Sequence, residues 1–238
     1  MKKTQLFLLH FAGGSNYSFQ FLTPLLPEFE VISLELPGRG KRMREPLLNN
    51  FDEAATDLYK QILARLTTAP FLIYGHSMGA YLTLRVTNML EKAGRYPAGI
   101  VVSGNAGPGI KRAGKKMRYL LDRRELLEEL KQLGGLPPQL AENEELFSVF
   151  EPILRADFEI TERNEIEHET AVQASLYAIM GSLEEDVADI NNWSRFTSSH
   201  FKAEILEGDH FFIHKHPQRL AGIIHAFYRS VHAHPQQY

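Results

Sequence analysis

The sequence predicts an α/β fold, in which a mostly parallel central sheet is covered by helices on both faces. Short apolar, β-branched or aromatic segments alternate along the chain with helical patterns, and short turns join them. This alternation is typical of parallel sheets, because neighbouring parallel strands are joined by a crossover helix. The 238 residues fit one large domain, and 44% hydrophobic residues provide a sizeable core. We therefore expect one domain over residues 1–238.

The expected elements follow from the period of the apolar residues. Strands are expected at residues 5–10, 31–36, 71–74, 100–103, 176–180 and 204–206. Helices are expected at residues 17–25, 52–66, 80–92, 187–196 and 217–233.

Residues 107–171 interrupt this alternation with no convincing strand pattern. Two segments, 123–132 and 144–158, look helical. Because ligands of open α/β sheets bind beyond the carboxyl ends of the strands, a helical insertion between two strands is expected to form a lid over the site. Its early part carries a basic cluster, Lys111, Arg112, Lys115, Lys116, Arg118, Arg123 and Arg124, and its later part is acidic. The plainer interpretation is two solvated faces that attract each other; the alternative is docking of an acidic protein.

Composition narrows the function classes. The net charge of −3 gives no global attraction to nucleic acid or membranes, and no apolar stretch reaches the length of a membrane span. The apolar segment after Met1 is too short for a secretory signal, and His10 interrupts it. The absence of cysteine excludes disulfides and thiol chemistry. We therefore expect a cytoplasmic protein.

The pentapeptide Gly75-His76-Ser77-Met78-Gly79 lies between an expected strand and an expected helix. In a nucleophile elbow a strand turns sharply into a helix, and the serine on the turn exposes its hydroxyl. Small residues at both ends allow strand and helix to approach closely. The pattern and its context predict Ser77 as a catalytic nucleophile, rather than part of an ordinary glycine-rich turn.

A serine nucleophile needs a base and a third group that orients the base. In sheets of this kind the partners follow the serine in the order carboxylate, then histidine. His210 follows the last expected strand, so its loop reaches the sheet end that carries Ser77, and we predict it as the base. Asp186, after the strand at 176–180, is the predicted acid; Glu184, Glu185 and Asp189 are the alternatives.

Other interpretations of these residues are weaker. His210, His214 and His216 have a spacing that could hold a metal, but no matching carboxylate motif accompanies them and a serine triad needs no metal. We therefore predict neither a metal nor a cofactor.

The tetrahedral intermediate of acyl transfer carries an oxyanion, which two backbone N–H groups stabilise. The residue after the nucleophile, Met78, is expected to supply one donor. The glycine-rich segment Phe11-Ala12-Gly13-Gly14-Ser15 is expected to supply the other from Ala12. A phosphate-binding loop is the competing interpretation, but the segment lacks the lysine and the further glycine of such loops.

Five motifs together resemble the type II (external, editing) thioesterases of non-ribosomal peptide and polyketide synthases. They are His10-Phe11-Ala12-Gly13-Gly14-Ser15, Leu36-Pro37-Gly38-Arg39-Gly40 with Arg42 and Glu45-Pro46, Tyr74-Gly75-His76-Ser77-Met78-Gly79-Ala80, Leu154-Arg155-Ala156-Asp157-Phe158, and Gly208-Asp209-His210-Phe211-Phe212. The resemblance covers residues 6–225. It implies an α/β-hydrolase fold with a mobile helical lid, and hydrolysis of acyl groups from the phosphopantetheine arm of acyl or peptidyl carrier proteins.

The resemblance also implies site residues, with some departures. It assigns Ser77 and His210 as nucleophile and base and gives Arg155 and Asp157 a structural role near the lid, with ionic pairing between them as a hypothesis. The acid loop departs from the family's Gly-Gly-x-x-Asp-Pro, since it reads Gly-Ser-Leu-Glu-Glu-Asp at residues 181–186. Because enzymes of this family act alone and no apolar patch is legible in the sequence, we expect a monomer. The rival functions are a free-standing carboxylesterase, a medium-chain fatty-acyl thioesterase and a non-catalytic binding protein.

Overall fold

The computed structural model describes residues 2–110, 114, 116–135 and 143–233. Its centre is one six-stranded, all-parallel sheet in the order β2-β1-β3-β4-β5-β6. The strands are β1 (Thr4–Leu9), β2 (Phe29–Ser33), β3 (Phe71–His76), β4 (Gly99–Ser103), β5 (Ser175–Gly181) and β6 (Phe201–Leu206). The α/β class expected from the sequence is confirmed.

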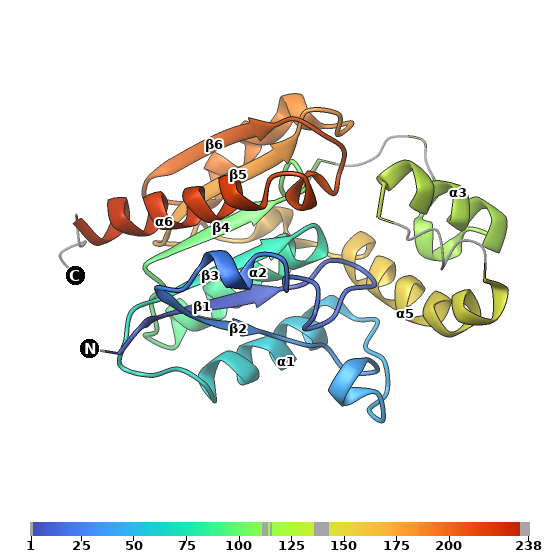
Figure 1. Cartoon of the computed structure of the whole chain (residues 1–238), viewed down its shortest axis with the longest axis horizontal. Coiled ribbons are helices and arrows are strands. Elements are labelled where there is room, and N and C mark those ends of the chain that lie inside the picture. The colour runs from blue at the N-terminus through green and yellow to red at the C-terminus, as the bar shows by residue number, and fades with distance from the viewer. Residues whose placement is uncertain (1, 111–113, 115, 136–142, 234–238) are drawn as a thin grey trace.

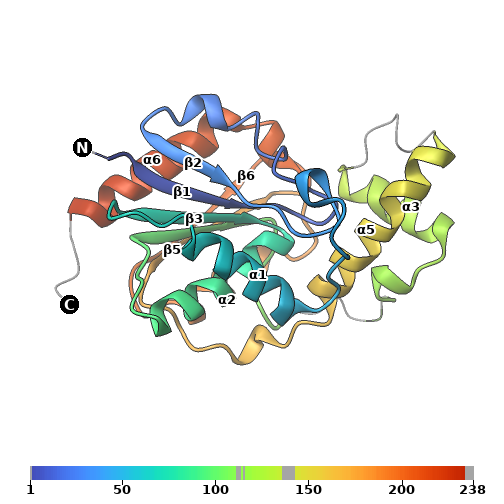
Figure 2. The same cartoon turned by 90° about the horizontal axis from the view of Figure 1, so that it is seen from below.

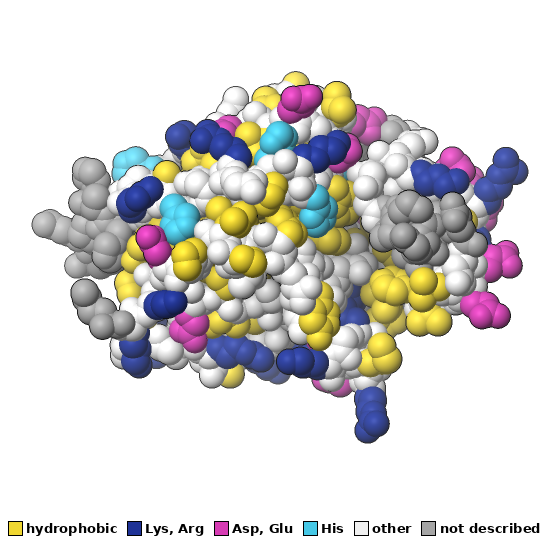
Figure 3. Space-filling view, in the orientation of Figure 1, with side chains coloured by type: hydrophobic (Ala, Val, Ile, Leu, Met, Phe, Trp, Pro, Cys, Tyr) yellow, Lys and Arg dark blue, Asp and Glu magenta, His cyan; other side chains and the backbone are white. Residues whose placement is uncertain are grey.

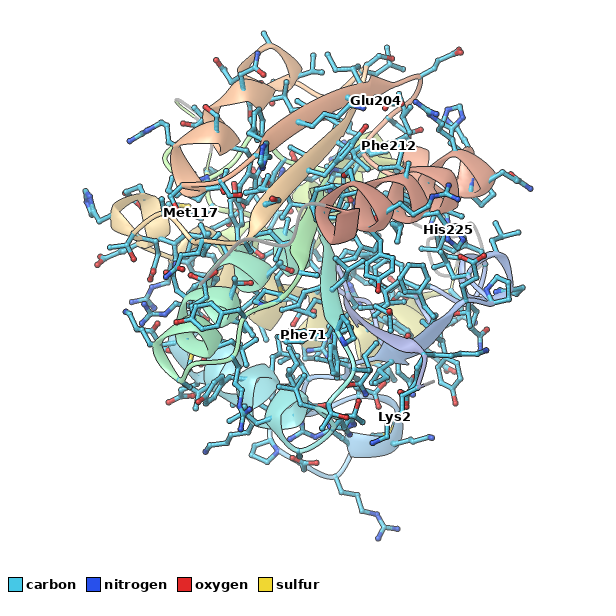
Figure 4. All side chains as sticks on the ribbon, turned by 90° about the vertical axis from the view of Figure 1, so that its left-hand side faces the viewer. Lys2, Phe71, Met117, Glu204, Phe212 and His225 are labelled. Carbon is cyan, nitrogen blue, oxygen red and sulfur yellow. The ribbon has the colours of Figure 1, made fainter. Side chains whose placement is uncertain are left out.

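Helices cover both faces of the sheet. Helices α1 (Phe51–Leu63) and α2 (Met78–Lys92) lie on one face, and α6 (Pro217–Ala233) lies on the other (Figure 2). Each face has its own hydrophobic core: Phe7 and Ile73 pack toward α1 and α2, whereas Leu6 and Leu72 pack toward α6. Alternate residues of a strand point to opposite faces, which is why neighbours in sequence enter different cores. Viewed along the strands, the side chains fill both layers, with His225 of α6 on one side (Figure 4).

Two expected helices are shorter or tighter than the sequence indicates. Residues 17–25 form turns that end in a 3-10 segment, Thr23–Leu25, and Val187–Phe196 is a 3-10 helix. The second expected strand begins and ends earlier, at Phe29–Ser33. Within residues 17–25, Pro24 lacks the backbone N–H that would continue an α-helix.

The helical insertion follows β4 and lies beyond the carboxyl ends of the strands (Figure 1). Helices α3 (Arg123–Leu133) and α5 (Glu144–Glu162) share a small core of Leu126, Leu130, Phe147, Leu154 and Phe158. Asp122 begins α3 with a capping box, and Gly134 ends it in the left-handed conformation. The insertion therefore has its own packed interior and faces the end of the sheet that carries Ser77.

Three of the four described residues of the basic cluster pair with acidic residues from both the early and the later part of the insertion. Lys116 pairs with Glu125, Arg118 with Glu129 and Glu162, and Arg123 with Glu151. These contacts favour the plainer interpretation of mutually attracting faces for those residues. Lys111, Arg112 and Lys115 lie outside the described residues. Among the described residues, no helix is both long enough and apolar enough to cross a membrane.

Candidate active site

Ser77 lies on a strained turn between β3 and α2. It has φ 55° and ψ −115°, and it is the only non-glycine residue of positive φ in the described chain. Such a conformation costs on the order of 1–3 kcal/mol and persists only where its surroundings enforce it. The Ser77 N–H donates to the carbonyl of Ser103 at 2.7 Å, and the Asn105 Nδ2 donates to the Ser77 carbonyl at 2.9 Å. Strand β4 and the residues after it therefore hold both sides of the turn.

The two glycines of the elbow are required because a Cβ at either position would collide with the neighbouring backbone. A Cβ on Gly75 would lie 2.1 Å from the carbonyl oxygen of Gly79, and a Cβ on Gly79 would lie 2.2 Å from that of Leu9. Real Cβ atoms do not approach backbone oxygens so closely. Strand β3, helix α2 and strand β1 can therefore meet here only because these two positions are glycine, as the sequence pattern predicts.

His210 meets the Ser77 hydroxyl. Its Nε2 lies 2.9 Å from Ser77 Oγ, which is hydrogen-bonding distance. The loop of residues 207–212 that carries His210 follows β6 and is tied to the loop after β5, because the Leu183 N–H donates to the Gly208 carbonyl at 2.9 Å. The loop after β5 thus holds the imidazole of His210 within hydrogen-bonding distance of Ser77, although 133 residues separate the two in the sequence.

The carboxylate that contacts the His210 imidazole is Glu184. Its Oε2 lies 2.7 Å from His210 Nδ1, and its Oε1 accepts from the Gly181 N–H at 2.8 Å. The expectation that Asp186 contacts the base is therefore corrected: the tight turn after β5 directs Glu184 to the imidazole, while Asp186 directly precedes the 3-10 helix Val187–Phe196. Glu184 was among the alternatives. Asp209, beside the base, instead accepts from the Phe211 N–H and from Lys215.

Buried groups beneath the site are kept neutral. The His76 Nδ1 lies 2.8 Å from Ser103 Oγ, which also meets the Tyr74 hydroxyl at 2.9 Å. Burial, and the neighbouring His210, hold the pKa of His76 well below its ordinary value. His76 therefore stays uncharged next to the imidazole that has to carry the proton.

His10 is also held neutral. Burial, followed by the nearby Arg39 guanidinium, lowers its pKa to about 4. Its Nδ1 lies 2.9 Å from the Phe11 carbonyl, so the side chain supports the turn into residues 11–15. A neutral imidazole at this position adds no charge to the region where an oxyanion would form.

The two expected oxyanion donors lie beside Ser77. Met78 is the first residue of α2, where a backbone N–H has no partner within the helix. Ala12 lines the cavity next to Ser77, and no acceptor within the described residues binds its N–H. Residues 11–15, the oxyanion loop, are closed by a bond from the Gly14 N–H to the Phe11 carbonyl at 2.9 Å.

Arg155 and Asp157 lie on α5 but do not pair with each other, so that hypothesis is wrong. Arg155 pairs with Glu151 at 2.7 Å and donates to backbone carbonyls before α3. Asp157 is fully buried and pairs with Arg39, with 2.5 Å between Oδ2 and Nη1. The sequence offers no signal for this partner, because 118 residues separate the two side chains.

A cavity of about 1380 Å³ opens onto Ser77 between the sheet and the helical insertion. Its apolar wall comes from the insertion and includes Leu130, Leu133, Phe150, Ile153 and Phe158. Hydrophobic side chains also gather on the surface in the part of Figure 3 where the insertion lies, and the α5 residues Leu146 and Val149 are 41% and 63% exposed. The cavity suits a substrate with an apolar part that reaches the serine from outside.

A metal centre finds no support in the described residues, where no group of three or more histidine and acidic side chains gathers. His214 instead stacks on Phe211, and burial lowers its pKa. His216 Nε2 contacts the Glu207 carbonyl.

Comparisons with known proteins show the family of this chain. A family model described as a thioesterase domain matches residues 4–228. The protein named linear gramicidin dehydrogenase LgrE, from Brevibacillus parabrevis, is 34% identical over 94% of this chain and 88% of its own. The medium-chain S-acyl fatty acid synthase thioesterase of Rattus norvegicus is 30% identical over 85% of this chain and 78% of its own. The structure of YbtT, a type II thioesterase from the yersiniabactin NRPS/PKS biosynthetic pathway, has a TM-score of 0.85 at 26% identity and covers 97% of this chain and 94% of its own.

Proposed function

Because this chain belongs to the thioesterase family, we propose that it removes aberrant or stalled acyl groups from the phosphopantetheine arm of carrier proteins in non-ribosomal peptide or polyketide synthesis. The observation that carries the proposal is the chain of contacts from Ser77 through His210 to Glu184, at the floor of a cavity. The similar protein YbtT is a type II thioesterase from an NRPS/PKS biosynthetic pathway.

The proposed reaction has two steps. His210 Nε2 takes the proton of Ser77 Oγ, and the oxygen attacks the thioester carbonyl carbon. The Ala12 and Met78 N–H groups donate to the resulting oxyanion. The carbon–sulfur bond then breaks, and His210 returns the proton to the pantetheine thiolate. In the second step His210 removes a proton from water, and the water oxygen attacks the acyl-enzyme carbonyl carbon. The bond from that carbon to Ser77 Oγ then breaks, and His210 returns the proton to Ser77 Oγ, so a carboxylic acid is released and the free serine is restored. Glu184 holds the imidazole tautomer and stabilises the imidazolium in both steps. Water is the only co-reactant.

The setting of this reaction is part of the proposal. The partner is an acyl or peptidyl carrier protein, and the enzyme acts as a cytoplasmic monomer without a cofactor. The helical insertion, residues 107–171, serves as a lid that admits a slim pantetheine arm, since its inner wall forms one side of the cavity.

The test is the intact mass of a carrier protein loaded with a short acyl-pantetheine. We expect wild-type enzyme to remove the acyl mass and Ser77→Ala to leave it, with carrier binding retained. Hydrolysis by the Ser77→Ala variant would refute the role of the serine. Failure of the wild type on several carrier-bound acyl groups, with turnover of nitrophenyl esters, would favour a free-standing esterase instead.

A second candidate, release of medium-chain fatty acids, is favoured by the similarity to the rat enzyme and by the apolar wall of the cavity. A series of carrier-bound acyl groups from two to twelve carbons separates the two functions. Editing predicts the highest kcat/KM for short groups, whereas the alternative predicts a maximum at eight carbons or more.

A further inference from the structure

Helix α5 of the insertion reaches the oxyanion loop through Asp157. This side chain is fully buried, and its Oδ2 accepts a hydrogen bond from the Gly13 N–H at 2.7 Å. Gly13 directly follows Ala12, the proposed oxyanion donor. A carboxylate from the insertion therefore binds the peptide next to the one that has to donate to the substrate.

Arg39 fixes this carboxylate from the other side. Its Nη1 and Nη2 lie 2.5 and 2.7 Å from the two oxygens of Asp157, and its Nη1 also donates to the Gly14 carbonyl at 3.2 Å. The guanidinium is 4% exposed. The two-pronged contact sets the orientation as well as the position of the carboxylate. One buried ion pair thus holds two successive residues of the oxyanion loop. Asp157 accepts from the Gly13 N–H, and Arg39 donates to the Gly14 carbonyl.

Helix α5 makes a second contact with the same loop. Gly13 has φ +75°, and a Cβ built on it would lie 2.6 Å from Leu154 Cδ2. Leu154 and Asp157 are three residues apart and therefore lie on one face of the helix. The loop is enclosed by this face on one side and by Arg39 on the other, so its backbone has little freedom.

We propose that Asp157, held by Arg39, is a positioning residue that sets the direction of the Ala12 N–H, and that α5 is therefore part of the catalytic framework. The proposal rests on the acyl transfer proposed above. Donors that act on a transition state are most effective when they are fixed before the reaction. A buried ion pair is a weak device for stability alone, because apolar side chains of similar volume often replace it without loss. The hydrogen bond from the Gly13 N–H to Asp157 is a contact that apolar side chains could not make.

The experiment compares two double variants, Arg39→Met with Asp157→Leu and Arg39→Met with Asp157→Asn. Both remove the buried charges, and leucine and asparagine have similar shapes. Only the asparagine variant keeps an oxygen that can accept from the Gly13 N–H. The readouts are kcat and KM for an acyl-pantetheine thioester and for a nitrophenyl ester, the inhibition constant of a trifluoromethyl ketone, and the melting temperature. The ketone adds to the serine and places an oxyanion in the hole, so its affinity reports the donors directly.

We expect the leucine variant to have a kcat at least about tenfold below that of the asparagine variant, since loss of a whole oxyanion donor costs about 10²–10³-fold. The affinity for the ketone should fall by a similar factor, while KM changes by less than about threefold. Equal kcat values and equal ketone affinities in two folded variants would overturn the proposal. Failure of the leucine variant to fold would also overturn it, because the pair would then be structural.

The two proposals can fail separately. The ester and the ketone need no carrier protein, so they decide the role of Asp157 even if the wild-type enzyme leaves carrier-bound thioesters intact. That last result would refute the proposed substrate alone.

Discussion

Replacing Glu184 by glutamine tests the assignment of the acid most directly. The glutamine side chain has the same length and can still accept from the Gly181 N–H through its Oε1. At His210 Nδ1, however, a carboxylate oxygen at 2.7 Å is exchanged for an NH₂ group, which cannot accept a hydrogen bond from Nδ1–H. The imidazole then favours the tautomer with the proton on Nε2, facing Ser77 Oγ 2.9 Å away. In that tautomer His210 cannot act as a base.

The expected loss of kcat is large and specific. The comparable change of an orienting aspartate to asparagine in a serine triad lowers kcat by about 10⁴, or about 5 kcal/mol of transition-state stabilisation. Glu184 is only 8% exposed, so water has little access to replace it. We expect a fall of about 10³–10⁴-fold in the kcat of thioester hydrolysis, with KM nearly unchanged and the fold intact by circular dichroism.

Asp186→Asn is the matched control, because Asp186 lies two residues away and also lines the cavity. It should retain at least about a tenth of the wild-type kcat, because the partner of His210 Nδ1 is Glu184. The reverse ranking, with Glu184→Gln active and Asp186→Asn inactive, would refute the reasoning and restore the acid that the sequence favoured.

Three further predictions follow from the same contacts. Asn105→Asp keeps the acceptor for the Gly107 N–H, but it loses the donor to the Ser77 carbonyl and adds a negative charge, so kcat should fall at least about tenfold. The control is Asn192→Asp, because the Asn192 amide binds the carbonyls of Ala106 and Pro108 instead. This variant should change kcat far less. His10 has a pKa of about 4 in the folded protein and 6.5 in the unfolded chain, so the unfolded chain binds this proton first as the pH falls. The stabilising contribution of neutral His10 is therefore complete above pH 6.5 and is lost between pH 6.5 and 4. It amounts to about 3 kcal/mol of unfolding free energy. Urea unfolding of His10→Gln over that range should show a correspondingly weaker dependence on pH, and an unchanged dependence would contradict the burial argument. Gly181→Ala would place a Cβ 2.4 Å from the Asp209 carbonyl oxygen and should lower both melting temperature and kcat, while Gly222→Ala on helix α6, where nothing lies within 4 Å, should raise the melting temperature slightly.

The fold was predictable because its signals are local. The strands are five to seven residues long, the inner strands β1, β3, β4 and β5 are mostly apolar and buried, and α1 and α2 show helical periodicity. The exceptions have local causes as well. Residues 17–25 have a helical apolar pattern but form turns, because their side chains Phe19 and Leu22 reach the core on the α6 side without a regular helix. Periodicity reports which residues are buried, and it does not distinguish a helix from compact turns.

The site was predictable only where chemistry and chain order constrain it. Ser77 and His210 are marked by the strand–turn–helix context and by the position after the last strand. The acid is not marked in this way, because Glu184, Glu185 and Asp186 are adjacent in one short loop. Which of them reaches His210 depends on the turn that closes between the Glu184 N–H and the Gly181 carbonyl, and on the approach of the loop at residues 207–210. Neither contact has a signature in composition or spacing.

The contacts that the sequence could not reveal share one property, since each holds a proposed reacting group from a different element. Asn105 after β4 binds the peptide that joins Ser77 to Met78. Asp157 of α5 binds the loop that carries Ala12, and Glu184 after β5 binds His210. A strained serine with φ 55° persists only where its surroundings enforce the conformation. The long sequence separations of these contacts, 28, 144 and 26 residues, are therefore a consequence of the mechanism: donors and base must be fixed relative to one another, and only different elements of the fold can hold them from different directions.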